Sequence, residues 1–284
     1  MIHFLEAVVQ YEFLQKALIT SVMVGIISGV IGCFIILRGM ALMGDAISHA
    51  VLPGVAISYM LGINFFIGAV VTGIATAIGI GYISQNSRIK NDSSIGIMFT
   101  SAFALGIILI TLMKSSTDLY HILFGNVLAV RPSDMWTTLV IGLIVLGGVL
   151  LFYKELLVSS FDPIMSQAYG LPNKAIHYFL MALLTLVTVA SLQTVGIILV
   201  VAMLITPAST AYLLTNRLST MLLLSTVFGT VAAIVGLYLS FTYNLASGAT
   251  IVLVATGLFI LSFLFSPKQG IVWRSLRTKK TALP

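Results

Sequence analysis

Two ionisable side chains lie inside one of the apolar stretches of this chain. Asp45 and His49 are four residues apart in the segment GMALMGDAISHAVLPG. On a helix, residues at this spacing share one face, with about 5 to 6 Å between their Cβ atoms. A carboxylate oxygen and an imidazole nitrogen can then converge on one divalent cation, because both are common metal ligands. The spacing therefore predicts a metal site at Asp45 and His49.

The same pair has a second interpretation, an ion pair inside the membrane that binds no metal. A carboxylate at the middle of a membrane helix costs roughly 2.5 to 3.5 kcal/mol, so it normally faces a partner, water or a pathway. Two ligands from one helix do not complete the coordination shell of a divalent cation. If a metal binds here, other helices, water or a second copy of the chain must supply the remaining ligands.

The composition sets the fold class. Hydrophobic residues make up 59% of the 284 residues and charged residues 8%, whereas a soluble domain carries about 25% charged residues. Runs of about 20 apolar residues, each long enough to cross a bilayer, recur along the chain. The sequence predicts an all-α, polytopic transmembrane helical bundle of eight or nine spans. The expected spans are 17–37, 41–61, 64–85, 94–113, 135–153, 174–191, 194–214, 219–240 and 247–266.

The span expected at 41–61 is the least regular, because Gly39, Gly44, Pro53 and Gly54 interrupt it. Proline lacks the N–H that a helix interior needs, so this span is expected to be broken.

Three regions follow from this pattern. Residues 1–16 are expected to form an interfacial helix, 17–266 the transmembrane domain, and 267–284 a basic cytoplasmic tail. The basic tail places the C-terminus in the cytoplasm by the positive-inside rule, and nine spans then place the N-terminus outside. The net charge of +6 belongs to this orientation and to lipid headgroups, so no nucleic-acid partner is expected.

Two further features exclude functions. Cys33 is the single cysteine, so neither a disulfide within one chain nor a thiolate cluster can form. The chain contains no G-x-x-x-x-G-K-[ST] phosphate loop, which excludes a P-loop ATPase.

A second segment, SFDPIMSQAYGLPN, has the signals of a short helix at about 162–170. Asp162 suits the N-cap and Pro163 the first helical position. Gly170 suits the left-handed position after the helix, and Pro172 prevents continuation. A helix of this length is unstable alone in water. It is therefore expected to dock on a partner or on its own protein.

Several motifs together resemble a known family. GDAISHAVLPGVA, the FDP...GLP loop, LFGNVL and TVGIILVVAMLITPASTA are similar to the permease subunits of bacterial ABC importers for manganese, zinc or iron, and most similar to the manganese permeases of streptococci. The resemblance implies a homodimeric transport subunit, not itself an enzyme, in the bacterial cytoplasmic membrane. It implies two partners, a cytoplasmic ATPase subunit and an extracellular metal-binding lipoprotein.

The resemblance also implies residue roles. The matching loop residues Asp162, Pro163, Gly170, Leu171 and Pro172 would form the coupling helix that meets the ATPase. Mn²⁺ would be the transported ion, and no cofactor would be bound permanently.

Two alternatives remain open from the sequence. A secondary metal carrier driven by an ion gradient would also need an intramembrane Asp and His pair. Zinc or iron could replace manganese: zinc favours nitrogen and sulfur ligands, whereas a site with a carboxylate and no nearby cysteine suits the harder Mn²⁺.

Overall fold

The computed structural model describes residues 2–112 and 127–266, and this part of the chain is helical and contains no strand. Eight of its helices are long and apolar enough to cross a membrane. They are α2 (Glu12–Leu37), α5 (Phe65–Asn86), α6 (Asn91–Leu112), α8 (Pro132–Leu151), α11 (Asn173–Val195), α12 (Ile197–Leu214), α13 (Leu218–Tyr243) and α14 (Ser247–Phe265). The predicted all-α transmembrane bundle is confirmed.

The segment expected at 41–61 forms two short helices, α3 (Leu42–Ala50) and α4 (Leu52–Leu61). Pro53 lies in the first turn of α4, where its missing N–H leaves no backbone hydrogen bond unmade. The expected break is therefore present. In position along the chain, the nine expected spans therefore correspond to the eight long helices and to the pair of short helices α3 and α4.

The N-terminal region forms two helices rather than one. Residues 1–16 were expected to form a separate helix, but α1 covers Ile2–Gln10 and α2 begins already at Glu12. An ion pair of 2.6 Å between Glu12 and Lys16, four residues apart, stabilises the first turn of α2. The interfacial position of α1 stays a prediction, and the basic tail at 267–284 lies outside the described residues.

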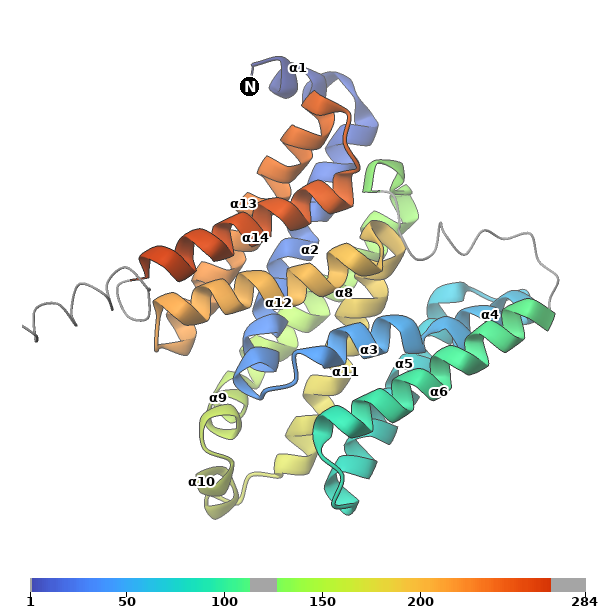
Figure 1. Ribbon diagram of the computed structural model, residues 1–284, viewed down its shortest axis with the longest axis vertical. Coiled ribbons are helices and arrows are strands. Elements are labelled where there is room, and N and C mark those ends of the chain that lie inside the picture. The colour runs from blue at the N-terminus through green and yellow to red at the C-terminus, as the bar shows by residue number, and fades with distance from the viewer. Residues whose placement is uncertain (1, 113–126, 267–284) are drawn as a thin grey trace, which may run out of the picture.

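The long helices surround α2, which runs through the middle of the molecule (Figure 1). On one side lie α12, α13 and α14, and on the other α3, α4, α5 and α6, while α8 and α11 pack alongside α2. Leu14, Ile31 and Phe34 of α2 are fully buried. This central helix therefore connects the two halves of the bundle.

Small residues let α2 and α13 approach closely. A Cβ atom added to Gly25 would lie 2.9 Å from the carbonyl carbon of Gly229, which is too close for any side chain. One turn further along, the hydroxyl of Ser225 donates a hydrogen bond of 2.9 Å to the carbonyl oxygen of Gly29. Cys33 is buried near this contact, with an exposed fraction of 0%. Gly25 and Gly29 therefore serve the packing of α2 against α13 within one chain.

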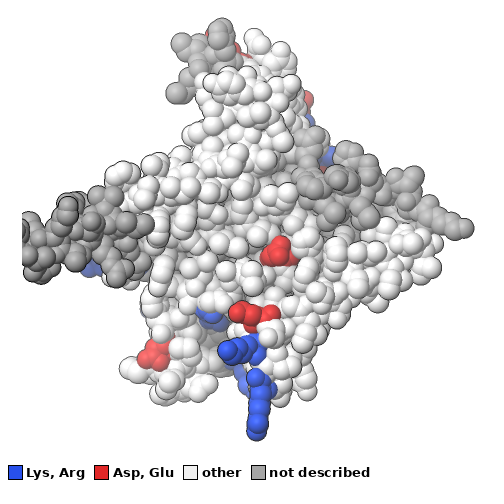
Figure 2. Space-filling model, in the orientation of Figure 1, with Lys and Arg blue, Asp and Glu red and all other residues white. Residues whose placement is uncertain are grey.

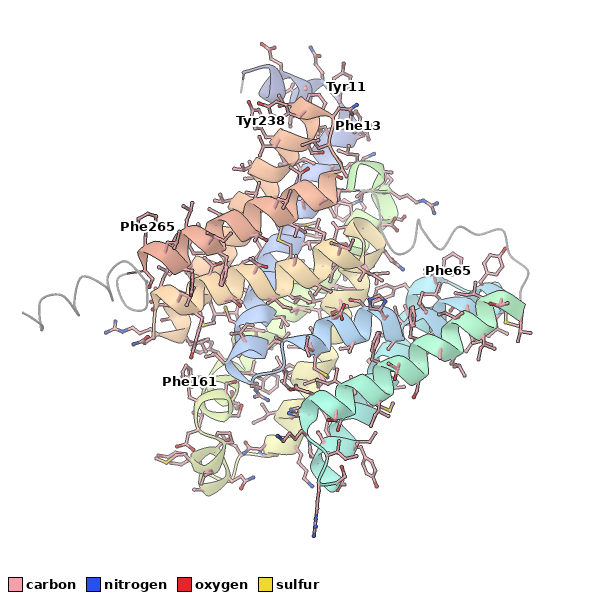
Figure 3. All side chains as sticks on the ribbon, in the orientation of Figure 1. Tyr11, Phe13, Phe65, Phe161, Tyr238 and Phe265 are labelled. Carbon is pink, nitrogen blue, oxygen red and sulfur yellow. The ribbon has the colours of Figure 1, made fainter. Side chains whose placement is uncertain are left out.

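The short helices α9 (Tyr153–Phe161) and α10 (Pro163–Ala168) lie at one end of the molecule, and the turn between α5 and α6 lies at the same end (Figure 1). Figure 2 shows Lys and Arg side chains at this end and a nearly uncharged surface over the middle of the same face. Figure 3 places Tyr11, Phe13 and Tyr238 near the opposite end, as is common for aromatic residues at membrane interfaces. The positive-inside rule therefore predicts that the α9 and α10 end faces the cytoplasm.

Candidate metal site

Asp45 and His49 lie together on α3 and face a cavity of about 490 Å³. The Nε2 atom of His49 is 3.6 Å from the Oδ1 atom of Asp45. This distance is longer than a hydrogen bond but short enough for both atoms to share one cation. The other residues that line the cavity are Ile197, Ile198, Val201, Ala202, Ile205 and Thr206 of α12 and Val252 of α14. The structure therefore places the two predicted residues side by side.

Two aromatic rings of α6 fix the orientation of His49. The ring centroids of Phe99 and Phe103 each lie 5.4 Å from the centroid of the imidazole. The Nδ1 atom of His49 is buried and has no hydrogen-bond partner among the described residues, while Nε2 is directed at Asp45. Nε2 is thus the ring nitrogen available to a cation. A metal on Nε2 requires the remaining proton to sit on Nδ1.

The backbone before α3 positions this pair. Arg38 ends α2, and Gly39 follows with a left-handed φ of +66°. The N–H of Gly39 bonds to the carbonyl of Ile36 and the N–H of Met40 to that of Ile35, which is the Schellman arrangement. The chain therefore turns sharply at the end of α2, and α3 starts only three residues after Gly39.

The opposite wall of the cavity is formed mainly by α12 and is almost entirely apolar. Among the described residues, Thr206 is the only one besides Asp45 and His49 that brings a polar side chain to the lining. Thr206 lies in the motif TVGIILVVAMLITPASTA, but nothing in the sequence distinguishes it from its neighbours there. Its spacing from Asp45 and His49 along the chain gives no signal, because only the packing of α3 on α12 brings the three together.

The described part of the chain contains no cluster of three or more His, Cys, Asp or Glu residues that could hold a metal ion. Met40, Met43 and Met203 are buried in the core and do not line the cavity. Asp118 and His121 lie in the segment outside the described residues. Within the described residues, Asp45 and His49 are therefore the strong ligands that face the cavity.

The segment expected to form a coupling helix has the predicted geometry. Oδ1 of Asp162 accepts hydrogen bonds from the backbone N–H groups of Ile164 (3.1 Å) and Met165 (2.9 Å), as an N-cap does. Pro163 begins the helix. Gly170 has a left-handed φ of +74°, and the N–H of Leu171 bonds to the carbonyl of Ser166 at 3.1 Å. Both ends of α10 are thus closed by the residues expected, and their contact with an ATPase stays a prediction.

Asn173, which no sequence signal marks as functional, holds α10 in place. The Nδ2 atom of Asn173 donates a hydrogen bond of 2.8 Å to the carbonyl oxygen of Pro163, and its Oδ1 accepts one from the hydroxyl of Ser166. Pro172 lies directly before α11, so it separates the two helices. Ile164 and Tyr169 point outward, with exposed fractions of 81% and 70%. One face of α10 is therefore attached to the chain, and another is free.

Comparison with known proteins decides the family. Residues 10–266 match the ABC 3 transport family. The chain belongs to the ABC 3 transport family. The match covers α2 to α14, so it includes both the cavity and α10. The resemblance inferred from the motifs, and the assignment as a transport subunit rather than an enzyme, are confirmed.

Relatives in the ABC 3 transport family are similar over nearly their whole length. The manganese transport system membrane protein MntC of Listeria monocytogenes is 72% identical over 96% of this chain and 98% of its own. The manganese import system permease protein ScaB of Streptococcus gordonii is 54% identical over 96% of this chain and 99% of its own. The solved structure of PsaBC from Streptococcus pneumoniae, in complex with a Fab, has a TM-score of 0.87 at 54% identity and covers 98% of this chain and 100% of its own.

Proposed function

We propose that this chain is the membrane permease subunit of an ATP-binding cassette importer that moves Mn²⁺ into the cytoplasm. The observation that carries the proposal is the Asp45 and His49 pair, which faces a cavity between α3 and α12 in a chain of the ABC 3 transport family. The names of the relatives, which refer to manganese transport and import, support the choice of metal.

The ligand chemistry of the cavity also favours Mn²⁺ over Zn²⁺. Its polar side chains are a carboxylate, an imidazole and the hydroxyl of Thr206, and its lining contains no cysteine. Oxygen ligands suit Mn²⁺, whereas Zn²⁺ is held best by nitrogen and sulfur in a tetrahedral site. Because affinity generally increases from Mn²⁺ toward Zn²⁺ for any given site, zinc is the competitor that the experiment must include.

The site is incomplete within one copy, so we assign the permease as a homodimer. Asp45 and His49 supply two strong ligands, and Mn²⁺ prefers about six. A second copy, water or both must provide the others. In a homodimer whose two cavities meet, the Asp45 and His49 side chains of both copies would provide four ligands. No further charged residue would then be needed in the membrane, where every charged side chain costs free energy.

The two ends of the molecule have different partners in this proposal. The cytoplasmic ATPase subunit binds α10, whose exposed Ile164 and Tyr169 offer an apolar surface. The metal-binding lipoprotein delivers Mn²⁺ on the opposite side, outside the bacterial cell membrane. Nucleotide-driven movement of α10 then opens and closes the pathway that contains Asp45 and His49, as conformational gating requires.

Transport by reconstituted vesicles tests the proposal. The permease is incorporated with its ATPase subunit, and Mn²⁺ uptake is measured with ATP, without ATP and with a catalytically inactive ATPase. We expect uptake only with ATP and the active subunit. Uptake by the permease alone, driven by a proton or sodium gradient, would establish the secondary-carrier alternative instead. Zn²⁺ and Fe²⁺ in the same assay identify the metal, and preferred uptake of either would overturn the manganese assignment.

A further inference from the structure

The side chain of Arg38 joins two parts of the molecule that are distant in sequence. Its Nη2 atom donates a hydrogen bond of 2.6 Å to the hydroxyl of Ser159, and its Nε atom donates one of 3.1 Å to the hydroxyl of Ser160. Arg38 ends α2, whereas both serines lie in the last turn of α9. One guanidinium group therefore fastens the end of α2 to the end of α9.

The surroundings of Arg38 are unusual for a charged side chain. Arg38 is half-buried, and burial lowers its pKa because the charged form loses solvation. Arginine keeps its charge in proteins, so this cost is not relieved by loss of a proton. Within the described residues its side-chain hydrogen-bond partners are the two neutral hydroxyls. A long apolar side chain would occupy the same space without this cost. The presence of a guanidinium group that binds two hydroxyls at once therefore indicates a role beyond filling space.

The serine end of this contact is directly connected to α10. Ser160 and Asp162 are separated only by Phe161, which Figure 3 places at the outer edge of the molecule. Asp162 belongs to both short helices, because its N–H bonds to the carbonyl of Val158 in α9 and its carboxylate caps α10. A displacement of α10 therefore moves the last turn of α9.

The arginine end of the contact is directly connected to the cavity. The turn after Arg38 is held by backbone hydrogen bonds from Gly39 to Ile36 (3.1 Å), from Met40 to Ile35 (3.0 Å) and from Met43 to Met40 (3.0 Å). α3 begins at Leu42, and Asp45 lies in its first turn. Only six residues separate Arg38 from Asp45 along the chain, and hydrogen bonds hold the turn between them together. A displacement of Arg38 is therefore passed on to α3.

We propose that Arg38 is a positioning residue that transmits the movement of α10 to Asp45 and His49, through Ser159 and Ser160 on one side and the turn at Gly39 on the other. The inference rests on the proposed function, because it takes α10 as the contact with the ATPase. The planar guanidinium holds both hydroxyls at once in a fixed direction, whereas a lysine ammonium offers a point charge on a flexible stem. Arg38 touches neither the metal nor the ATPase in this role.

A simpler role for Arg38 is that of a positive charge that orients the protein in the membrane. Arg38→Lys separates the two roles, since it keeps the charge and loses the fork. The double variant Ser159→Ala and Ser160→Ala distinguishes the two roles independently, because it keeps the charge of Arg38 and removes its hydrogen-bond partners. Arg217→Met is the matched control, because Arg217 is an exposed arginine before α13 on the side predicted to be cytoplasmic.

The experiment uses the complete permease with its ATPase in vesicles and measures the number of Mn²⁺ ions imported per ATP hydrolysed. We expect this ratio to fall about tenfold in Arg38→Lys and in the Ser159 and Ser160 double variant, as loss of a charge-assisted hydrogen bond implies. Mn²⁺ binding to the permease and co-purification of the ATPase should be unchanged, and Arg217→Met should behave as the natural chain. Combining Arg38→Lys with the two serine changes should add no further loss, because all remove the same contact.

Each outcome of this experiment decides one question. If Arg38→Lys and the serine variant import as many Mn²⁺ ions per ATP as the natural chain, the inference is overturned and the proposed function stays intact. Loss of Mn²⁺ binding or of ATPase association in these variants would also overturn it, because Arg38 would then shape a binding site. Absence of ATP-dependent uptake by the natural chain would instead overturn the proposed function. Should Arg38→Lys fail to assemble, the serine variant alone decides, since it removes only two hydroxyl groups.

Discussion

Asn173 is hydrogen-bonded to Pro163 across the whole length of α10, through a contact of 2.8 Å between its Nδ2 atom and the proline carbonyl oxygen. Its Oδ1 atom also accepts from Ser166, so the one side chain attaches α10 to the start of α11 at two points. Asp162 caps α10, but Asn173 determines where the capped helix lies.

Asn173→Ala is expected to detach α10 without unfolding its cap. Each lost hydrogen bond costs about 0.5 to 1.5 kcal/mol, so α10 should sample other positions and ATP-dependent uptake should fall. Faster hydrogen exchange of the amides at 163–170 measures the change. Asn173→Asp is the matched variant, because it keeps the acceptor for Ser166 and removes the donor to Pro163. Equal uptake in the natural chain and in Asn173→Ala would contradict this role.

Asp162→Ala and Gly170→Val are expected to weaken α10 itself. The lost N-cap costs about 0.5 to 2 kcal/mol of helix stability. Valine is strained at the positive φ of +74° that Gly170 adopts, because its Cβ crowds the backbone there. ATPase co-purification and ATP-dependent uptake should both fall, while Mn²⁺ binding to the permease persists. If the double variant keeps ATPase association and full uptake, α10 is not the coupling helix.

Asp45→Asn and His49→Ala are expected to abolish metal transport while the protein still inserts into the membrane. An amide costs less in the membrane than a carboxylate, so expression should be maintained or improved. Mn²⁺ affinity should fall by about 10- to 100-fold or more, since even changes outside the ligand shell cost that much. Ser48→Ala is the control on the same helix, where a buried hydroxyl bonds to the carbonyl of Gly44 at 2.8 Å. Full uptake in either ligand variant would support the alternative of an ion pair without metal.

Acidification is expected to weaken Mn²⁺ binding, because a proton and the metal compete for the same lone pair on Nε2 of His49. Binding by the purified permease should decrease as the pH is lowered from about 8 to about 5, the range in which histidine most often changes charge. The weaker binding of His49→Gln should vary less over that range, since glutamine has no basic ring nitrogen for which a proton and the metal compete. Binding by the natural chain that stays constant over the same range would indicate a structural role for His49.

Thr206→Val is expected to reduce the preference for Mn²⁺ over Zn²⁺. The change removes the third polar side chain of the cavity at nearly constant volume, and a hydroxyl oxygen, directly or through water, suits the harder ion. A loss of roughly two- to tenfold in Mn²⁺ affinity corresponds to one ordinary hydrogen bond. Thr210→Val is the control, because its hydroxyl bonds within α12 to the carbonyl of Thr206 and does not line the cavity. An unchanged ratio of the two affinities would exclude Thr206 from the site.

Local signals in the sequence predicted local structure well. The four-residue spacing of Asp45 and His49 and the capping residues Asp162 and Gly170 depend only on neighbouring residues, and the structure has the expected geometry at each. The break beside Pro53 was also expected, since proline acts on its own turn.

Contacts between distant helices could not be predicted in the same way. Arg38 meets Ser159 and Ser160, and Thr206 meets the cavity of Asp45, only after α2, α3, α9 and α12 have packed together. In an apolar chain, hydroxyl side chains occur on many helix faces and most bond to their own helix. Their spacing therefore does not reveal which of them serves a distant partner.

The buried position of Cys33 has a practical consequence for measuring these movements. The chain contains one cysteine, and its side chain is fully enclosed between α2 and α13, with the thiol 3.6 Å from the carbonyl oxygen of Met221. Thiol-directed reagents need an accessible sulfur, so the natural chain should be almost unlabelled. A single cysteine in place of the exposed Ile164 would then carry a fluorescent or spin label on α10 alone, without prior removal of the native thiol.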